Sequence, residues 1–366
     1  MIVAQTRQRA APRFYPELES LRGLAALTVV WLHANILAGG RADFQSAHGV
    51  IQIVARFLTP GNAAVVLFFV LSGFVLSQTI HPDSFDFLKY GLRRLFRLMP
   101  ALWVAIAFAV AANFALDQPV DWGAAFQATY FADFHIDPPL WSLNVEFYLS
   151  VFLLPVLALA TPRLGTVGNL LLQAALFGYF LKTGLMSYAY LFHLGCLIPT
   201  IGQWSIVKIR ENSVILAIVI SSVLFFVSNI AVEMSPADYF TYGLALAAMP
   251  SFLAVSYLVA IEDGAVPRFM RTGPVRFIGR ISYSVYILHW PVIHIVLKFI
   301  QAQIGVLLVA TLATIAAATI CYYGVELPFI TLGRRLTRRP SMPSREYVDG
   351  KASPASTASS PAGTDG

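Results

Sequence analysis

The sequence has 366 residues, of which 57% are hydrophobic and 12% are charged, with a formal net charge of +6 at neutral pH. A soluble domain usually contains about 25% charged residues, so this composition excludes an ordinary soluble protein and indicates a chain surrounded by lipid. The first twenty residues are polar, basic and proline-containing, which is not the pattern of a cleavable signal peptide.

Apolar segments of membrane-spanning length recur from the N-terminal region to about residue 323. They predict an all-α fold, a polytopic transmembrane bundle of about ten spans; nine or eleven spans fit the polar ends of several segments as well. The predicted spans are 21–39, 62–80, 99–116, 141–160, 166–182, 186–203, 213–232, 240–261, 281–300 and 303–323.

Basic residues indicate how this bundle is oriented. Of the 25 lysines and arginines, all but Arg41, Arg56, Lys182 and Lys298 fall in the N-terminal segment, in alternate loops or in the C-terminal segment. Because cytoplasmic loops carry the excess of basic residues, we expect both termini on the cytoplasmic side. The net charge then reflects membrane orientation, and its spread over separate loops predicts no nucleic-acid partner.

The chain divides into three predicted parts. Residues 1–20 form a short cytoplasmic segment, residues 21–333 the membrane domain, and residues 334–366 a basic and then disordered cytoplasmic tail rich in Ser, Pro, Ala, Thr and Gly. The two cysteines, Cys196 and Cys321, lie far apart inside apolar segments and indicate small buried residues. No spacing of Cys and His predicts a metal site.

Arg22 and His33 lie in the first predicted span. Eleven helical residues advance about 1100°, so both side chains share one face, and the rise of roughly 16 Å carries His33 from the membrane surface to near mid-bilayer. An ionisable group at that depth is costly and points to function. The alternative is a structural histidine whose polar atoms are satisfied by a neighbouring helix.

Arg93, Arg94 and Arg97 form a cluster just before Pro100, with i,i+3 and i,i+4 spacing that lets three guanidinium groups face one anion. Arginine binds phosphate in a bidentate manner and stays charged. Ordinary positive-inside anchoring explains such a cluster equally well.

Trp141, Ser142 and Glu146 open the fourth predicted span from the outer side. A carboxylate inside a span should face the bundle interior and have a partner, and His33 is a candidate because it approaches mid-depth from the inner side. A histidine oriented by a carboxylate makes a competent general base. The alternative is a Glu146 held by helix amides or by a salt bridge.

Ser282, Tyr286 and His289 follow i, i+4 and i+7 spacing on one face of the ninth predicted span. Such a polar stripe in a membrane helix lines a substrate cavity or makes hydrogen bonds between helices, and the sequence favours neither.

Six motifs, taken in order along about residues 14–330, resemble those of the membrane acyltransferase 3 family, which includes bacterial polysaccharide and lipopolysaccharide O-acetyltransferases. They are Arg22 with His33, Leu71-Ser72-Gly73-Phe74, Arg94 with Arg97, Trp141-Ser142-Leu143 with Glu146, Ile281-Ser282-Tyr283-Ser284 with Tyr286 and His289, and Tyr323 with Glu326, Pro328 and Phe329.

The resemblance implies an O-acyltransferase in the bacterial inner membrane, with acetyl-CoA or another acyl-CoA as co-substrate and no metal. Arg22, Arg94 and Arg97 are then the residues that bind the CoA phosphates, and His33, with Glu146, carries the chemistry. The acceptor is expected to be a hydroxyl of a carbohydrate in a cell-surface or exported glycan, approaching near Trp141, Ser142, Tyr286 and His289. Some members carry a further extracytoplasmic hydrolase-like domain, which has no counterpart in residues 334–366.

Two mechanisms and two further functions stay open from the sequence. His33 either deprotonates the acceptor hydroxyl for direct attack on the thioester or takes the acyl group first. A proton-coupled transporter also needs His and Glu in mid-membrane, although the two halves of the chain show no pseudo-symmetry. An acyltransferase acting on a secondary metabolite such as a macrolide is the other alternative.

Overall fold

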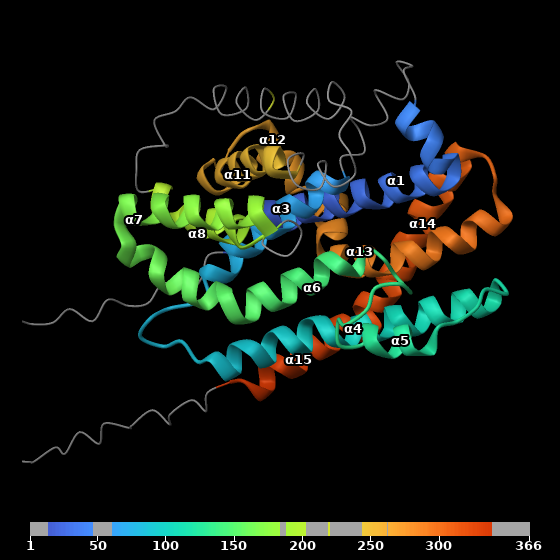
Figure 1. The fold of residues 1–366 in the computed structure, drawn as a ribbon, viewed down its shortest axis with the longest axis horizontal. Coiled ribbons are helices and arrows are strands. Elements are labelled where there is room, and N and C mark those ends of the chain that lie inside the picture. Colours follow the sequence, from blue (N-terminus) through green and yellow to red (C-terminus); the bar gives the residue numbers. More distant parts are fainter. Residues whose placement is uncertain are drawn as a thin grey trace, which may run out of the picture.

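The structure is a computed structural model that describes residues 14–46, 61–183, 188–202, 219, 244–261 and 263–338. Within these ranges the chain is helical and contains no strand, in agreement with the predicted all-α class (Figure 1). The α-helices are α1 (Pro16–Ser46), α3 (Gly61–Ser77), α4 (Phe87–Ala115), α5 (Trp122–Ala128), α6 (Leu140–Tyr148), α7 (Leu154–Thr183), α8 (Ala189–Gly202), α11 (Leu244–Ala260), α12 (Ala265–Met270), α13 (Gly273–Phe299), α14 (Gln303–Cys321) and α15 (Leu327–Leu336); η1 (Leu149–Leu153) and η5 (Tyr322–Glu326) are π-helical.

Four described helical stretches are long and apolar enough to cross a membrane: Pro16–Gly39, Phe87–Ala115, Leu140–Thr183 and Gln303–Leu336. One face of α14 shows the same character, because Ile304, Leu308, Leu312 and Ile320 are exposed at multiples of four residues, with the exposed Val309 beside them. A soluble protein rarely exposes such a continuous apolar stripe, so the chain is a multi-pass membrane protein.

Each predicted span coincides with a helix in the structure except 213–232, which lies outside the described residues apart from residue 219. The boundaries differ at several ends. α1 begins at Pro16 rather than at residue 21, and α13 begins at Gly273, about two turns before the predicted residue 281. The predicted spans 141–160 and 166–182 are joined without a loop, because α7 changes direction at Gly165, where φ is 61°.

α1 and α13 pack against each other through glycines. A Cβ atom on Gly23 would lie 2.5 Å from the backbone nitrogen of Gly279, and a Cβ atom on Gly279 would lie 2.5 Å from the carbonyl oxygen of Glu19. Small residues allow two membrane helices to approach this closely, which fixes how one helix lies along the other. The start of α1 is also held by Ser20, which donates to the Met270 carbonyl at 2.6 Å.

α3 and α8 form a second close contact. A Cβ atom on Gly73 would lie 2.2 Å from the carbonyl oxygen of Phe192, and one on Gly195 would lie 2.3 Å from the carbonyl oxygen of Val70. Small-residue packing of this kind is a physical reason for a glycine in the motif Leu71-Ser72-Gly73-Phe74. Beside this contact, Phe69 and Phe192 stack with ring centroids 5.5 Å apart.

α4 and α15 lie side by side along one edge of the bundle (Figure 1). Arg93 near the start of α4 donates from Nε to the Thr337 hydroxyl at 2.7 Å, just after the end of α15. A common interior is surrounded by α1, α3, α4, α6 and α13, and the candidate site lies there.

We expect Gly73→Ala to destabilise the folded protein by about 1–3 kcal/mol, because the added methyl group meets backbone atoms of α8 that cannot rotate away. Unfolding of the purified protein in detergent, followed by tryptophan fluorescence, measures the change. Gly91→Ala is the matched control, since a Cβ atom there has nothing within 4 Å and alanine favours the helix. Equal midpoints for the two variants would contradict the predicted clash.

Candidate functional site

A cavity of about 830 Å³ lies between α1, α3, α4, α6, α13 and α15. This volume is typical of a site for a sizeable small molecule. Six basic and three acidic residues line the cavity, so it carries a surplus of positive charge. They are Arg22, Lys89, Arg93, Arg94, Arg97 and Arg334, with Glu19, Asp86 and Glu146.

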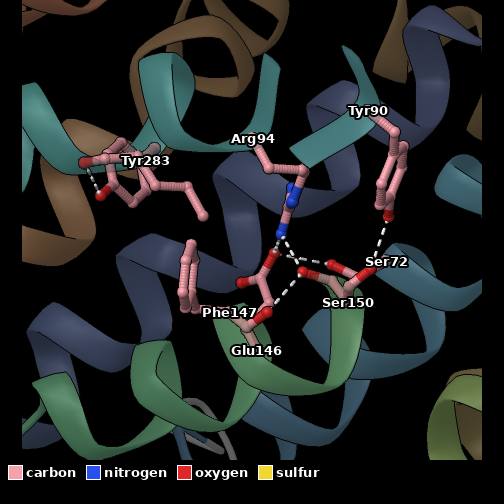
Figure 2. A network of polar contacts seen from close by, with 8 residues as sticks. Ser72, Tyr90, Arg94, Glu146, Phe147, Ser150 and Tyr283 are labelled. Atoms are coloured by element: carbon pink, nitrogen blue, oxygen red, sulfur yellow. Dashed lines mark hydrogen bonds and ion pairs between the residues drawn. The ribbon is translucent and has the colours of Figure 1, made fainter. Parts of the chain in front are cut away.

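Arg94 and Glu146 form an ion pair in the wall of this cavity (Figure 2). Arg94 Nη2 lies 3.1 Å from Glu146 Oε1 and donates to the Ser150 hydroxyl at 2.8 Å, while Ser72 donates to the same Glu146 oxygen at 2.9 Å. The Arg94 side chain is 7% exposed and that of Glu146 is 21% exposed. Tyr90 donates to the Ser150 carbonyl at 2.6 Å and closes the network.

Arg94 retains one unused donor. Its Nε is buried and has no hydrogen-bond partner within the described residues. A buried guanidinium donor without a partner is costly, so the Arg94 side chain would gain from reorienting toward an acceptor oxygen brought into the cavity that it lines. The site therefore fits a ligand that brings acceptor oxygens.

The three arginines of the predicted cluster take different directions. Arg93 binds Thr337, Arg94 binds Glu146, and Arg97 lines the cavity, where its charge interacts with Arg22 and Glu326. All three line the cavity, as does Arg22 from α1, but Arg93 and Arg94 also have protein partners. Arg22 Nε donates to the Ser282 hydroxyl of α13 at 2.8 Å.

The predicted pairing of His33 with Glu146 is wrong, because each has a different partner. His33 Nδ1 lies 2.8 Å from His289 Nε2, and Glu146 is bound by Arg94 and Ser72. The alternative interpretations of the sequence apply in part: a neighbouring helix does satisfy one His33 nitrogen, and a salt bridge does hold Glu146. The prediction that Arg22 and His33 share a face agrees with the structure, since both face α13.

Tyr286 lies between the cavity and the histidine pair. It lines the cavity with Ser142, and its hydroxyl lies 2.6 Å from the Ser142 hydroxyl and 3.0 Å from the Pro139 carbonyl oxygen. Its main-chain carbonyl oxygen contacts His289 Nδ1 at 2.5 Å. Among the described lining residues, Tyr286 is the one furthest along α13.

Six of the nine predicted site residues line the cavity: Arg22, Arg94, Arg97, Ser142, Glu146 and Tyr286. His33, His289 and Trp141 are absent from its described lining. Trp141 packs on Tyr188, with ring centroids 5.8 Å apart. His289 is completely buried, which leaves no surface for the substrate contact that the sequence suggested.

The sequence analysis missed several polar residues of the site. Ser72 and Ser150 bind the Arg94–Glu146 pair, and Ser150 had a usable signal, since it follows Glu146 by four residues. Glu326, 1% exposed at the end of η5, accepts from the Ser284 hydroxyl at 2.8 Å. Ser284 and Glu326 each belong to one of the six motifs, but nothing in the sequence showed that they contact each other. In the described part of the chain, no group of three His, Cys, Asp or Glu residues can hold a metal ion.

Asp137, in the segment just before α6, is 1% exposed, and neither carboxylate oxygen has a hydrogen-bond partner within the described residues. Burial raises the pKa of this carboxyl well above its usual range. The nearby Asp133 behaves differently: its carboxylate accepts from the backbone of His135, and this hydrogen bond lowers its pKa.

Comparison with known proteins gives a consistent picture. Residues 15–325 match a family model described as an acyltransferase domain. O-acetyltransferase OatA of Staphylococcus aureus is 26% identical over 372 residues, which cover 87% of this chain and 57% of that protein. Peptidoglycan O-acetyltransferase OatA of Listeria monocytogenes is also 26% identical, with 87% of this chain and 56% of that protein covered. The chain thus spans a little over half the length of these two relatives.

A protein of Komagataeibacter xylinus, named as a membrane-bound transacylase, BcsY, is 25% identical over 352 residues, which cover 84% of this chain and 80% of that protein. No solved structure matches.

We expect Arg94→Met and Glu146→Gln to be strongly coupled, because either change alone leaves a poorly solvated charge, whereas the double change removes both. A double-mutant cycle on the free energy of unfolding in detergent should give an interaction of about 0.5–3 kcal/mol. Lys89→Met with Asp86→Asn is the control cycle, since both side chains of that ion pair are 37% exposed and should couple by less than about 1 kcal/mol. Independent effects of Arg94 and Glu146 would contradict the pairing.

We also expect Asp137 to make stability depend on pH. In the folded protein this carboxyl keeps its proton to a higher pH than it does in the unfolded chain. Loss of the proton therefore favours the unfolded chain, and the free energy of unfolding falls as pH rises above the unfolded pKa. Asp137→Asn should flatten this fall of the thermal midpoint between about pH 5 and 8. The exposed Asp117→Asn should leave the slope as in the parent protein. An unchanged slope in Asp137→Asn would be the contrary result.

Proposed function

We propose, from the premise that this chain belongs to the membrane acyltransferase 3 family, that it moves an acyl group from cytosolic acyl-CoA to a hydroxyl of a carbohydrate. Acetyl is the expected acyl group, because the relatives in Staphylococcus and Listeria are named O-acetyltransferases. The single observation that carries the proposal is the cavity with a surplus of positive charge and an unpartnered, buried Arg94 donor.

The proposed topology places about ten spans in the bacterial inner membrane, with both termini in the cytosol. Contacts between segment ends support this arrangement. Glu17 at the start of α1 binds Arg271 just before α13, and Arg93 near the start of α4 binds Thr337 just after α15. Each contact joins two segment ends that are both predicted to lie on the inner side. At the other end of α4, Lys298 donates to the Ala115 carbonyl oxygen, which pairs two predicted outer ends. Residues 1–20, 21–333 and 334–366 keep their proposed roles as inner segment, membrane domain and cytoplasmic tail.

The charge of the cavity supports the proposed donor. CoA carries phosphates at one end and a thioester at the other, joined by a flexible arm, so its site needs basic residues at a mouth and a narrow inner end. Arg93, Arg97 and Arg334 lie on α4 and α15, while Ser142 and Tyr286 line the cavity from α6 and α13. In the proposed topology, the arginines then face the cytosol, where the phosphates enter.

The acceptor is proposed by likeness to the relatives. The Listeria relative is named a peptidoglycan O-acetyltransferase, so a carbohydrate of the cell surface or an exported glycan is the expected substrate class here. The proposed approach is from the outer side, along the segment that leads into Ser142 and Tyr286. Transfer between an inner donor and an outer acceptor would carry an acyl group across the bilayer without moving CoA itself.

The proposed chemistry is direct transfer with His33 as general base. The acceptor hydroxyl gives its proton to the free nitrogen of His33 while its oxygen attacks the thioester carbonyl carbon. The tetrahedral intermediate then expels the CoA thiolate, the C–S bond breaks, an ester forms, and the proton passes from His33 to the sulfur. His33 contacts α13 at His289, which lies beyond Tyr286 as seen from the cavity. The thioester therefore has to extend past the Tyr286 side chain to reach His33.

We expect Arg97→Gln to weaken acetyl-CoA binding by about 10–100-fold, because it removes one charge-assisted contact from the cavity. Isothermal titration of the purified chain in nanodiscs measures the dissociation constant. Acetyl-pantetheine, which lacks the nucleotide phosphates, should bind both proteins equally. Arg163→Gln is the control, since Arg163 is exposed and contacts only the Leu159 carbonyl among its described neighbours.

His33→Ala should keep acetyl-CoA binding and lose transfer of labelled acetyl groups to cell-surface glycan in the native host. The donor proposal fails if Arg97→Gln binds acetyl-CoA as tightly as the parent chain. The acyltransferase proposal fails if His33→Ala, at normal protein level, leaves glycan acetylation unchanged.

A further inference from the structure

We infer that His289 is a positioning residue that holds His33 in the tautomer whose Nε2 is unprotonated and free to act as the base. This inference rests on the proposed function for its purpose, but its structural content is independent of it. It begins from the chain of contacts that runs from the Tyr286 carbonyl oxygen through His289 to His33.

The first step fixes the tautomer of His289. Its Nδ1 lies 2.5 Å from the main-chain carbonyl oxygen of Tyr286, and a carbonyl oxygen only accepts hydrogen bonds, so the hydrogen is on Nδ1. His289 is 0% exposed, and its polar contacts among the described residues are this carbonyl, the neighbouring main chain of Val285 and His33. A second proton would create a buried charge with no carboxylate in contact, which is costly. His289 is therefore neutral and its Nε2 is an acceptor.

The second step fixes the tautomer of His33. Its Nδ1 is 2.8 Å from the His289 Nε2, and since that nitrogen accepts, His33 Nδ1 must donate. A neutral imidazole with hydrogen on Nδ1 has its lone pair on Nε2. The nitrogen left for the acceptor hydroxyl is thus the one remote from α13.

The ring geometry favours a linear hydrogen bond over a stacked contact. The two rings are within 16° of parallel and their centroids are 5.0 Å apart, which exceeds the 2.8 Å nitrogen–nitrogen distance by about two ring radii. The rings therefore meet end to end, with the hydrogen bond near the line between centroids. Trp290 packs edge to face on His33, at 5.3 Å and 87°, and restricts rotation of the ring.

A neutral orienting group has a chemical consequence. A carboxylate would stabilise the imidazolium that forms when His33 takes the hydroxyl proton, whereas a neutral imidazole offers no charge to oppose it. The imidazolium is then a stronger acid, better able to return the proton to the departing CoA thiolate. Glu146 does not serve as the partner of His33, because its carboxylate already accepts hydrogen bonds from Arg94 and Ser72.

The tautomer is tested directly on the wild-type chain. Solid-state NMR of full-length protein with ¹⁵N-labelled histidine in lipid bilayers resolves protonated from unprotonated ring nitrogens, and a spectrum of His33→Gln identifies the His33 signals among the seven histidines. We expect His33 to show a protonated Nδ1 and a bare Nε2. A protonated Nε2 on neutral His33 would overturn the inference whatever the activity.

Two variants test whether this arrangement matters for the reaction. His289→Leu removes the acceptor, so kcat for acetyl transfer should fall about 10–100-fold, the scale of losing an orienting partner. The KM for acetyl-CoA should change less than about twofold, because the described cavity lining excludes His289. His289→Gln places an amide oxygen near the former Nε2 and should recover most of kcat.

The variant results separate positioning from packing. Equal loss of kcat in the Leu and Gln variants, or unchanged kcat in His289→Leu, would overturn the role of His289. If wild-type protein neither binds acetyl-CoA nor transfers acetyl groups, the proposed function fails, while the NMR spectrum still decides the tautomer. If the Leu variant does not fold, the wild-type spectrum and the Gln variant carry the test.

Discussion

The contact between α1 and α13 is the constraint on which the candidate site depends. Gly23 and Gly279 let the two backbones touch, so the helices have one fixed register. That register brings Arg22 to Ser282 near the start of both helices and His33 to His289 further along. A bulkier residue at either glycine would separate the helices and move both polar contacts at once, one of them in the cavity wall and the other beyond it.

Local periodicity predicted more of this site than long-range reasoning did. The shared face of Arg22 and His33 follows from 3.6 residues per turn and needs no knowledge of other helices. The partner of His33 depends on which helix faces it and at what height, and single-sequence spacing contains neither quantity. Depth alone suggested Glu146, but glycine packing at Gly23 brings His289 to His33 instead. The sequence also did not show that two predicted spans join at Gly165 without a loop. A bend in the backbone leaves the apolar pattern on both sides unchanged, so the two segments look like separate spans.

The arginine cluster shows how a compact motif spreads its roles. Successive helical residues point about 100° apart, and Arg93 and Arg94 accordingly have different protein partners. Arg93 fastens α4 to Thr337, and Arg94 is occupied by Glu146 and Ser150. Two of the three charges thus help hold the bundle together, and the motif's spacing gives no sign of this division. The resemblance singled out Arg94 and Arg97, and both line the cavity. The geometry adds that Arg94 already has protein partners for part of its guanidinium group before any ligand binds.

The two π-helical segments have a consequence for the helices that carry Glu146 and Glu326. η1 begins three residues after Glu146, and η5 ends at Glu326. A π-turn contains roughly one residue more than an α-turn, which rotates everything downstream by about 100°. Each helix can thus direct a polar face to the interior on one side of the turn and a new apolar face to lipid on the other. A helical wheel continued through residue 149 loses its phase, and comparison of relatives in this region has to allow one residue of slippage.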